Sequence, residues 1–236
     1  MHSTAGEPAA LARSPQELVP HGDRDHLVYV VERTDGGQRT VEGTQVEHMS
    51  ALDQPGAFEV TLSENGIPTG RVQARDDGHT IWLVSEDDLT RQIRLTYDPP
   101  LPYLELPLVA GERRAVSTAR MSRLADGQPA GALQVTQVQQ LGVAPPGRAR
   151  FGTYQHAVSV RTVRTLQSPE GTLELSTTMV LVPGIGEVLS DGLASGTPPT
   201  HRELVCAIIG GRTIGDCRNL NVILKESTDA GSTDLQ

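Results

Sequence analysis

Hydrophobic and polar residues alternate with a period of two along several stretches of the chain. The alternation is clearest in segments 58–63, 92–97 and 173–181. A period of two is typical of strands that turn one face to a core and the other to water. Other segments are rich in Val, Thr and Leu but change phase, as bulged or twisted strands do: 27–32, 39–46, 80–85, 115–124, 133–141 and 154–166.

Residues that form tight turns separate these segments. Segments 35–37 (DGG), 64–66 (ENG) and 126–127 (DG) contain residues that accept a positive φ angle. No convincing amphipathic helix lies between the strands, and a parallel sheet needs crossovers of about a dozen residues or more. The pattern therefore predicts an all-β protein. We expect an antiparallel meander that forms a curved sheet, a half-barrel or a sandwich, built as one sheet or as two similar halves.

Composition divides the chain into six successive segments. Ala, Pro, Ser and Gly dominate the first of them, where Ser14-Pro15-Gln16-Glu17 predicts at most one helical turn. Four prolines near the middle of the chain remove ladder donors, so we expect an extended connector there. The expected segments are a flexible N-terminal segment (1–24), an N-terminal β meander (25–98), the Pro-rich connector (99–107), a C-terminal β meander (108–192), a linker with a Cys-containing appendix (193–225) and a disordered acidic tail (226–236).

Size and charge exclude several classes of function. The chain has 236 residues, with 20 Lys+Arg against 29 Asp+Glu and a formal net charge of −9. A nucleic-acid binder held by phosphate contacts needs a concentrated basic surface, so we expect no nucleic-acid partner. Aromatic residues make up only 3% of the chain, too few for stacking platforms. No apolar run approaches the roughly 20 residues of a membrane helix, and no secretory signal is recognisable at the N-terminus.

The two cysteines, Cys206 and Cys217, enclose ten residues, three of which are glycines. Such a loop is flexible enough for the two sulfurs to meet. In an oxidising compartment a disulfide here would stabilise the fold by about 3 kcal/mol. The alternative is two separate buried thiols that behave as small apolar side chains. Neither cysteine has a CxxC partner or a His at ligand spacing, which argues against metal binding.

Three motifs resemble ligand-binding sequences but lack a necessary part. Segment 21–26 (HGDRDH) holds two imidazoles and two carboxylates that could bind a divalent cation, yet Arg24 opposes one and a solvated loop explains the cluster equally well. Segment 210–217 (GGRTIGDC) has the glycines of a phosphate loop but carries Asp216 where a lysine is required. Segment 184–189 (GIGEVL) lacks the third glycine of a dinucleotide-binding turn. We therefore expect no metal and no cofactor.

No set of residues suited to catalysis emerges from the sequence. No serine lies in a G-x-S-x-G turn, and Ser195 falls in a small-residue loop that is typical of a linker. Glu187 and Asp191 are two carboxylates that could serve glycoside chemistry, although carboxylates near turns are usually only solvated. His156 is better explained as an ordinary strand residue than as a base. We expect no catalytic residues and no enzymatic activity.

Four segments carry a resemblance to a known group of proteins. Segments 18–37 and 104–120 are similar to an opening motif, FPL-x-x-G-x-x-W-x-Y, although neither has its Trp. Segment 145–163 is similar to a PAG-x-F-x-x-Y-x-V strand, and 177–191, with its PGIG, to a T-x-x-Y-A-PGVG-x-V ending. These motifs belong to uncharacterised bacterial envelope proteins and lipoproteins. The resemblance implies a β-rich, extracytoplasmic, often lipid-anchored protein with no known chemistry.

Taken together, these features favour a non-enzymatic, extracytoplasmic binding or accessory protein. The alternating Val, Leu and Ile residues would form an apolar face that an acyl chain or another apolar small molecule could cover. The alternative is a structural subunit that docks onto a larger cell-envelope complex through a sheet edge or the Pro-rich connector. In that case segment 204–209 would be interface rather than core. The ligand, the protein partner and the oligomeric state are left open by the sequence.

Overall fold

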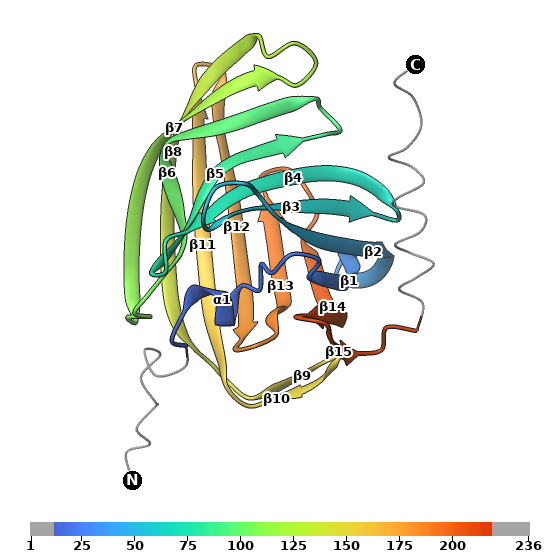
Figure 1. Cartoon of the computed structure of the whole chain (residues 1–236). Coiled ribbons are helices and arrows are strands. Elements are labelled where there is room, and N and C mark those ends of the chain that lie inside the picture. Colours follow the sequence, from blue (N-terminus) through green and yellow to red (C-terminus); the bar gives the residue numbers. More distant parts are fainter. Residues whose placement is uncertain (1–11, 219–236) are drawn as a thin grey trace, which may run out of the picture.

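The computed structural model describes residues 12–218 and consists mainly of strands (Figure 1). Within that range the one helix, α1, spans Pro15–Leu18, with proline at its first position as predicted. The strands, in chain order, are β1 (His26–Asp35), β2 (Gln38–Ala51), β3 (Ala57–Glu64), β4 (Ile67–Asp76), β5 (Thr80–Asp88), β6 (Ile93–Glu105), β7 (Gly111–Arg123), β8 (Pro129–Ala144), β9 (Gly147–Ala149), β10 (Gly152–Tyr154), β11 (Ala157–Ser168), β12 (Gly171–Val182), β13 (Gly186–Ala194), β14 (Thr200–Ile209) and β15 (Arg212–Gly215).

The strands form an antiparallel meander whose two ends meet. The order β1 to β8 and then β11 to β14 is continuous, and β1 also pairs with β14, from His26↔Ile208 to Arg33↔Thr200. Within residues 12–218, these twelve strands therefore close into a barrel. β15 is an additional strand. It pairs with residues 206–209 of β14, whereas β13 pairs with residues 200–203 of that strand. The prediction of an all-β antiparallel meander is confirmed, and its main strands form one sheet.

The turns predicted from the sequence join the strands. Between β3 and β4, Asn65 and Gly66 have φ angles of 49° and 81°, the left-handed conformations that a type I′ hairpin turn requires. Register shifts also interrupt several ladders, for example in β5 between Leu83 and Ser85. An extra residue moves every later side chain to the opposite face of the sheet. These bulges explain why the alternation of apolar and polar residues changes phase in such strands.

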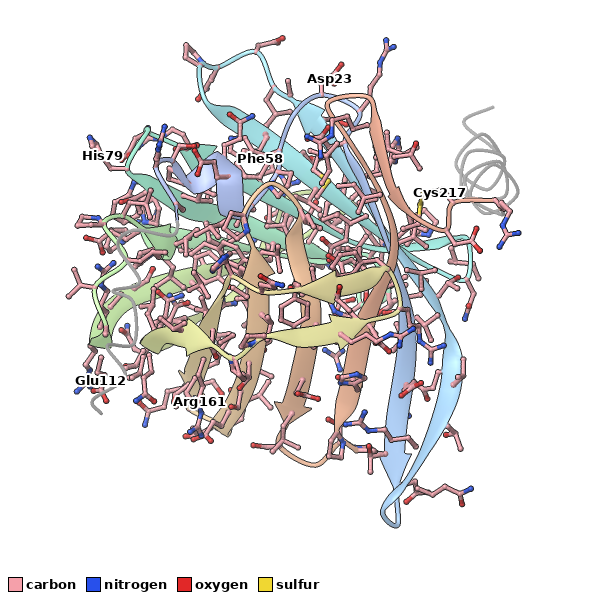
Figure 2. The ribbon with its side chains drawn as sticks, turned by 90° about the horizontal axis from the view of Figure 1, so that it is seen from below. Asp23, Phe58, His79, Glu112, Arg161 and Cys217 are labelled. Atoms are coloured by element: carbon pink, nitrogen blue, oxygen red, sulfur yellow. A yellow bond between two sulfur atoms is a disulfide. The ribbon has the colours of Figure 1, made fainter. Side chains whose placement is uncertain are left out.

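One end of the barrel is covered by α1, by the chain that follows it and by the hairpin β9–β10, which Figure 2 shows from below. Leu18 is fully buried in a cluster that includes Leu181. The Glu17 carbonyl also accepts a hydrogen bond from Gly184 N in the turn between β12 and β13 (2.6 Å). Residues 1–24 were expected to be flexible, but Ala12, Pro15, Leu18 and Pro20 are buried in the structure. Residues 1–11 lie outside the described residues.

The ladder between β6 and β7 stops part-way, at the prolines. β6 pairs with β7 from Ile93↔Arg123 to Asp98↔Thr118, whereas its later residues pair only with β5. We call the unpaired stretch, residues 99–105 of β6 opposite 111–117 of β7, the β6–β7 seam. The expectation of a separate connector at 99–107 is therefore corrected. Residues 99–105 are part of a strand, and the two predicted meanders belong to one barrel.

Side chains bridge the β6–β7 seam in place of a backbone ladder. Ser117 Oγ donates a hydrogen bond to Pro99 O (2.6 Å), and Gln137 Nε2 donates to Pro102 O (2.5 Å). Gln139 Nε2 makes an equivalent bond to the next carbonyl along β6 (2.9 Å). Because proline has no backbone N–H, a regular ladder would be incomplete here, and these side chains satisfy the carbonyls instead.

The C-terminal part of the described chain also differs from expectation. Residues 193–225 were expected to form a linker and an appendix, but β14 is the strand that closes the barrel against β1. Residues 219–236, which hold the end of that segment and the predicted acidic tail, lie outside the described residues. Among residues 12–218, the structure contains no helix with the length and apolarity needed to cross a bilayer.

Candidate functional site

Buried side chains fill much of the barrel interior, which also encloses a cavity of about 210 Å³. The cavity is bounded at the covered end of the barrel by the chain around α1. Most of its lining is apolar: Leu18, Val19, Pro20, Leu27, Met49, Phe58, Val60, Leu62, Val72, Ala74, Ile81, Leu83 and Leu181. The other lining residues are Tyr103 and five charged side chains: Glu47, Glu86, Glu187, Arg164 and Arg202. The alternation predicted in segment 58–63 places Phe58, Val60 and Leu62 together on this lining.

Arg202 on β14 joins two carboxylates on the cavity wall. Its Nη1 donates to Glu47 Oε1 on β2 (2.9 Å), and its Nη2 donates to Glu187 Oε1 on β13 (2.5 Å). Nε donates to Ser190 Oγ (3.0 Å), and the guanidinium carbon lies 4.8 Å from the centroid of the Tyr29 ring. We call Glu47, Glu187 and Arg202 the Arg202 cluster. Every nitrogen of this arginine has a partner, and the cluster contains one more carboxylate than guanidinium.

A second charged group lies on the cavity wall around Arg164 of β11. Its Nη1 donates to Glu86 Oε1 on β5 (2.8 Å), and its Nε donates to Gln137 Oε1 on β8 (3.4 Å). The Tyr97 hydroxyl donates to the other oxygen of Glu86 (2.8 Å). The guanidinium carbon lies 5.7 Å from the centroid of the Tyr97 ring. In this Arg164 cluster one guanidinium balances one carboxylate.

Burial controls the protonation of the groups around the Arg202 cluster. It raises the pKa of Tyr29 and of Tyr103, and the nearby glutamates raise both further, so the two phenols stay neutral. Burial also raises the pKa of Glu47, which Arg202 counteracts in part, while Glu187 adds to the rise. For Arg202, burial works to lower the pKa, but Glu187 and Glu47 outweigh it and the pKa is raised. The arginine is therefore a permanent cation within a mostly apolar interior.

The predicted pair Cys206 and Cys217 forms a disulfide, with Cα atoms 5.2 Å apart. Cys206 lies on β14 and packs against Val28 and Val46 on the face of the sheet opposite to the cavity-lining residues. Cys217 follows β15. The bond therefore fastens β15 and the end of the described chain to the strand that closes the barrel.

The titratable residues of segment 21–26 do not gather into one site. His21 stacks on Phe58 with ring centroids 4.3 Å apart, and its Nε2 lies 3.3 Å from Asp76. Asp25 is buried and accepts hydrogen bonds from two backbone N–H groups, while His26 pairs with a histidine of β2. Among residues 12–218, no three His, Cys, Asp or Glu side chains are arranged to hold a metal ion.

The carboxylates and the serine considered for catalysis also lie apart from each other. Glu187 faces the cavity, whereas Asp191, farther along β13, is exposed and contacts His201 (2.8 Å). Ser195 exchanges hydrogen bonds with the backbone of Glu174. His156 is exposed in the connection between β10 and β11. In segment 210–217, Gly210 and Gly211 form the turn between β14 and β15, Gly215 ends β15, and Asp216 pairs with Arg218.

Sequence reasoning singled out Glu187 but missed the other charged residues that line the cavity. Arg202, Glu47 and Arg164 each lie two positions from a buried apolar residue on the same strand: Leu204, Met49 and Leu166, respectively. Successive inward positions on a strand are two residues apart. A charged residue in phase with buried apolar residues was therefore the signal that could have found them.

A scan against protein-family models finds no match for this chain, and neither does a search of curated proteins. Two solved structures are similar to it. One is a candidate exported protein with a YmcC-like fold from Bacteroides fragilis NCTC 9343, with 14% identity over 82% of this chain and 97% of that chain and a TM-score of 0.49. The other is a candidate lipoprotein from Parabacteroides distasonis ATCC 8503, with 10% identity over 78% of this chain and 95% of that chain and a TM-score of 0.50. At this identity the second likeness shows a common fold alone.

Proposed function

We propose that this chain is an extracytoplasmic, non-enzymatic binding protein that holds a small apolar ligand, or the end of an acyl chain, inside the barrel. The observation that carries the proposal is the mostly apolar cavity of about 210 Å³. An engineered apolar cavity of about 150 Å³ in another protein binds benzene, so a cavity of this size has room for a small apolar molecule. Ligand sites in proteins are typically concave and apolar with a few fixed polar groups, and this cavity has that composition.

Two observations support a location outside the cytoplasm. The Cys206–Cys217 disulfide is a bond that persists in oxidising compartments and is rare in the cytosol. The similar Parabacteroides protein is a candidate lipoprotein, and its fold covers most of this chain. A binding protein with this barrel would then act in the periplasm or the cell envelope.

The lining of the cavity supports binding rather than catalysis. Covalent catalysis needs a nucleophile such as Ser, Cys, Lys, Asp or Glu that is free to react, with a base beside it. Among the described residues that line the cavity there is no Ser, Cys, Lys or His. The arginines are held in ion pairs with glutamates, which fixes their position.

A cavity-filling variant tests the proposal. Val60 lies on the lining, and Val60→Phe would add bulk where the ligand is expected to lie. We expect the full chain to bind 1-hexanol in a calorimetric titration and Val60→Phe to lose at least about tenfold in affinity, because overpacking removes the space. The matched control is Val116→Phe, since Val116 is 56% exposed on β7 and should bind as the unchanged protein does.

Native mass spectrometry of the protein from its own host gives an independent measurement. A discrete added mass of small-molecule size, lost in Val60→Phe, would support the binding function. Failure of the unchanged protein to bind 1-hexanol, together with a bare mass or one increased by a second polypeptide, would overturn it. The second polypeptide would favour a docking subunit instead.

A further inference from the structure

The charges that face the cavity are unequal in number. Among the described lining residues, three are glutamates and two are arginines, and no other lining residue carries a charge. The Arg164 cluster is balanced, because one guanidinium pairs with one carboxylate. In the Arg202 cluster, one guanidinium serves both Glu47 and Glu187. The excess negative charge therefore lies on the wall formed by these two glutamates.

These two carboxylates also have hydrogen-bonding capacity left over. Glu47 and Glu187 each accept from Arg202 through Oε1, and neither Oε2 atom accepts a hydrogen bond from any residue in 12–218. Glu187 is only 7% exposed, so bulk water gives it little compensation. Burial raises the pKa of Glu47, and Arg202, which Glu47 shares with Glu187, counteracts this rise only in part. The wall thus offers two acceptor oxygens and needs one positive charge.

The charges of the two arginines, in contrast, are already neutralised by glutamates. Arg202 uses all three nitrogens on Glu47, Glu187 and Ser190. Arg164 uses Nε and Nη1, and only its Nη2 has no hydrogen-bond partner among the described residues. A carboxylate placed there would lie beside Glu86, which already neutralises this guanidinium.

We propose that the ligand of this cavity carries a positively charged head group, such as a primary ammonium, on a short apolar chain. This inference rests on the proposed function and names the chemical class of its ligand. The ammonium donates hydrogen bonds to Glu47 Oε2 and Glu187 Oε2, and the chain occupies the apolar remainder of the cavity. A buried ammonium is stabilised only when it is paired and hydrogen-bonded, and the two glutamates supply both. A fatty acid is disfavoured, because its carboxylate adds a second uncompensated negative charge.

Three ligands with the same six-carbon chain test the head group: hexylammonium, hexanoate and 1-hexanol. Each is titrated into the full chain near neutral pH by calorimetry. We expect hexylammonium to bind about tenfold or more tightly than hexanoate, with 1-hexanol between them. Hexanoate binding as tightly as hexylammonium, or more tightly, would overturn the inference and leave the proposed function intact. Binding of none of the three would overturn the inference, and together with a bare mass in native mass spectrometry it would overturn the proposed function as well.

Two charge variants test whether the glutamates of the Arg202 cluster cause the preference for an ammonium head group. Glu47→Gln removes the excess charge and should weaken hexylammonium binding about tenfold, while 1-hexanol binding changes little. The matched control is Glu203→Gln on β14, since Glu203 pairs with Arg150 and does not line the cavity. If circular dichroism shows that Glu47→Gln is unfolded, Glu187→Gln takes its place. Unchanged hexylammonium affinity in a folded variant at Glu47 or Glu187 overturns the inference.

Discussion

At the scale of single residues, Arg202 explains how charge is tolerated inside the barrel. Moving a guanidinium out of water is costly unless its nitrogens find partners with good geometry. Here the partners come from three places: Glu47 on β2, Glu187 and Ser190 on β13, and the face of the Tyr29 ring on β1. The barrel brings these strands together around one side chain. The arginine is thereby a fixed part of the cavity wall.

His26 on β1 and His48 on β2 form a pair of stacked histidines. Their rings stack with centroids 4.5 Å apart, and their Nδ1 atoms lie 3.1 Å apart. Burial lowers the pKa of both, with the charge of His48 adding to the effect on His26. The unfolded chain takes up protons near the ordinary value of 6.5, whereas the folded protein takes them up only at lower pH. Stability therefore decreases as the pH falls through that value.

We expect the free energy of unfolding, measured by urea titration, to decrease from about pH 7 to about pH 5. His48→Gln should make this decrease smaller, because it removes one histidine whose pKa is lowered by folding. It also removes the charge that would repel a protonated His26. His156→Gln is the control, since His156 is exposed outside the strands and should leave the pH dependence as it is. An equal decrease in His48→Gln and the unchanged protein would show that this pair does not control acid stability.

At the scale of elements, side-chain hydrogen bonds replace the backbone ladder at the β6–β7 seam. Gln137 is 2% exposed, and both ends of its amide are hydrogen-bonded. Nε2 donates to Pro102 O and Oε1 accepts from Arg164. A buried carbonyl without a donor costs free energy, so the glutamine stabilises the seam by more than its packing. The same residue links the Pro-rich part of β6 to the cavity wall.

Gln137→Leu keeps most of the side-chain volume but leaves the Pro102 carbonyl and the Arg164 Nε without this partner. We expect the free energy of unfolding to fall by about 1–3 kcal/mol, the cost of a buried unsatisfied group. Chemical denaturation midpoints measure the change. Gln140→Leu lies on the same strand but is exposed, and it should change stability by less than about 0.5 kcal/mol. If the two variants were equally stable, water would have to satisfy the seam in place of Gln137.

Elements were predictable from the sequence where local pattern alone determines them. In segment 58–63, strict alternation predicted a strand, and its apolar residues do face the interior. Residues 99–105 were not predicted as a strand, because proline removes ladder donors and the replacement donors come from Gln137 and Gln139, far along the chain. Residues 12–24 gave no periodic signal because they pack as an irregular segment. In both places the deciding contacts are tertiary.

The charged part of the candidate site was harder to predict for the same reason. Glu187 was noticed beside its turn, but Glu47 and Arg202 are 155 positions apart in the chain. Nineteen of the 20 basic residues are arginines, so a functional arginine does not stand out by composition. Contact between Glu47 and Arg202 depends on which strands become neighbours when the sheet closes, and no local sequence pattern determines that. The disulfide was predictable because its two cysteines are close in sequence and share a glycine-rich loop.

At the scale of the whole molecule, the barrel depends on a ladder between the two ends of the described chain. β1 pairs with β14 over eight residue pairs, from His26↔Ile208 to Arg33↔Thr200. Such non-local pairing carries a loop-closure cost and is characteristic of folds that form slowly. The number of strands and their stagger must also agree for closure. The sequence predicted the meander, but closure into a barrel is a property of all the strands together.

The Cys206–Cys217 disulfide stabilises this molecule without closing the barrel. The bond joins residues only 11 positions apart and fastens β15 to β14, whereas the closing ladder lies on the other edge of β14. On the loop-entropy model, reduction should lower the free energy of unfolding by about 3 kcal/mol. Urea unfolding with and without reductant measures this change, and hydrogen exchange of the β1 amides reports whether the closing ladder persists.

We expect the reduced protein to keep protected amides in residues 29–33 of β1, because their partners in β14, residues 200–204, lie outside the loop that the disulfide closes. The control is the double variant Cys206→Ala, Cys217→Ala, whose stability should not respond to reductant. Loss of β1 protection on reduction under native conditions would mean that β15 is needed to hold β14 in place, so that closure of the barrel would depend on the oxidising compartment. Retained protection with lowered stability would assign the bond to the entropy of the unfolded chain and leave closure to the strands themselves.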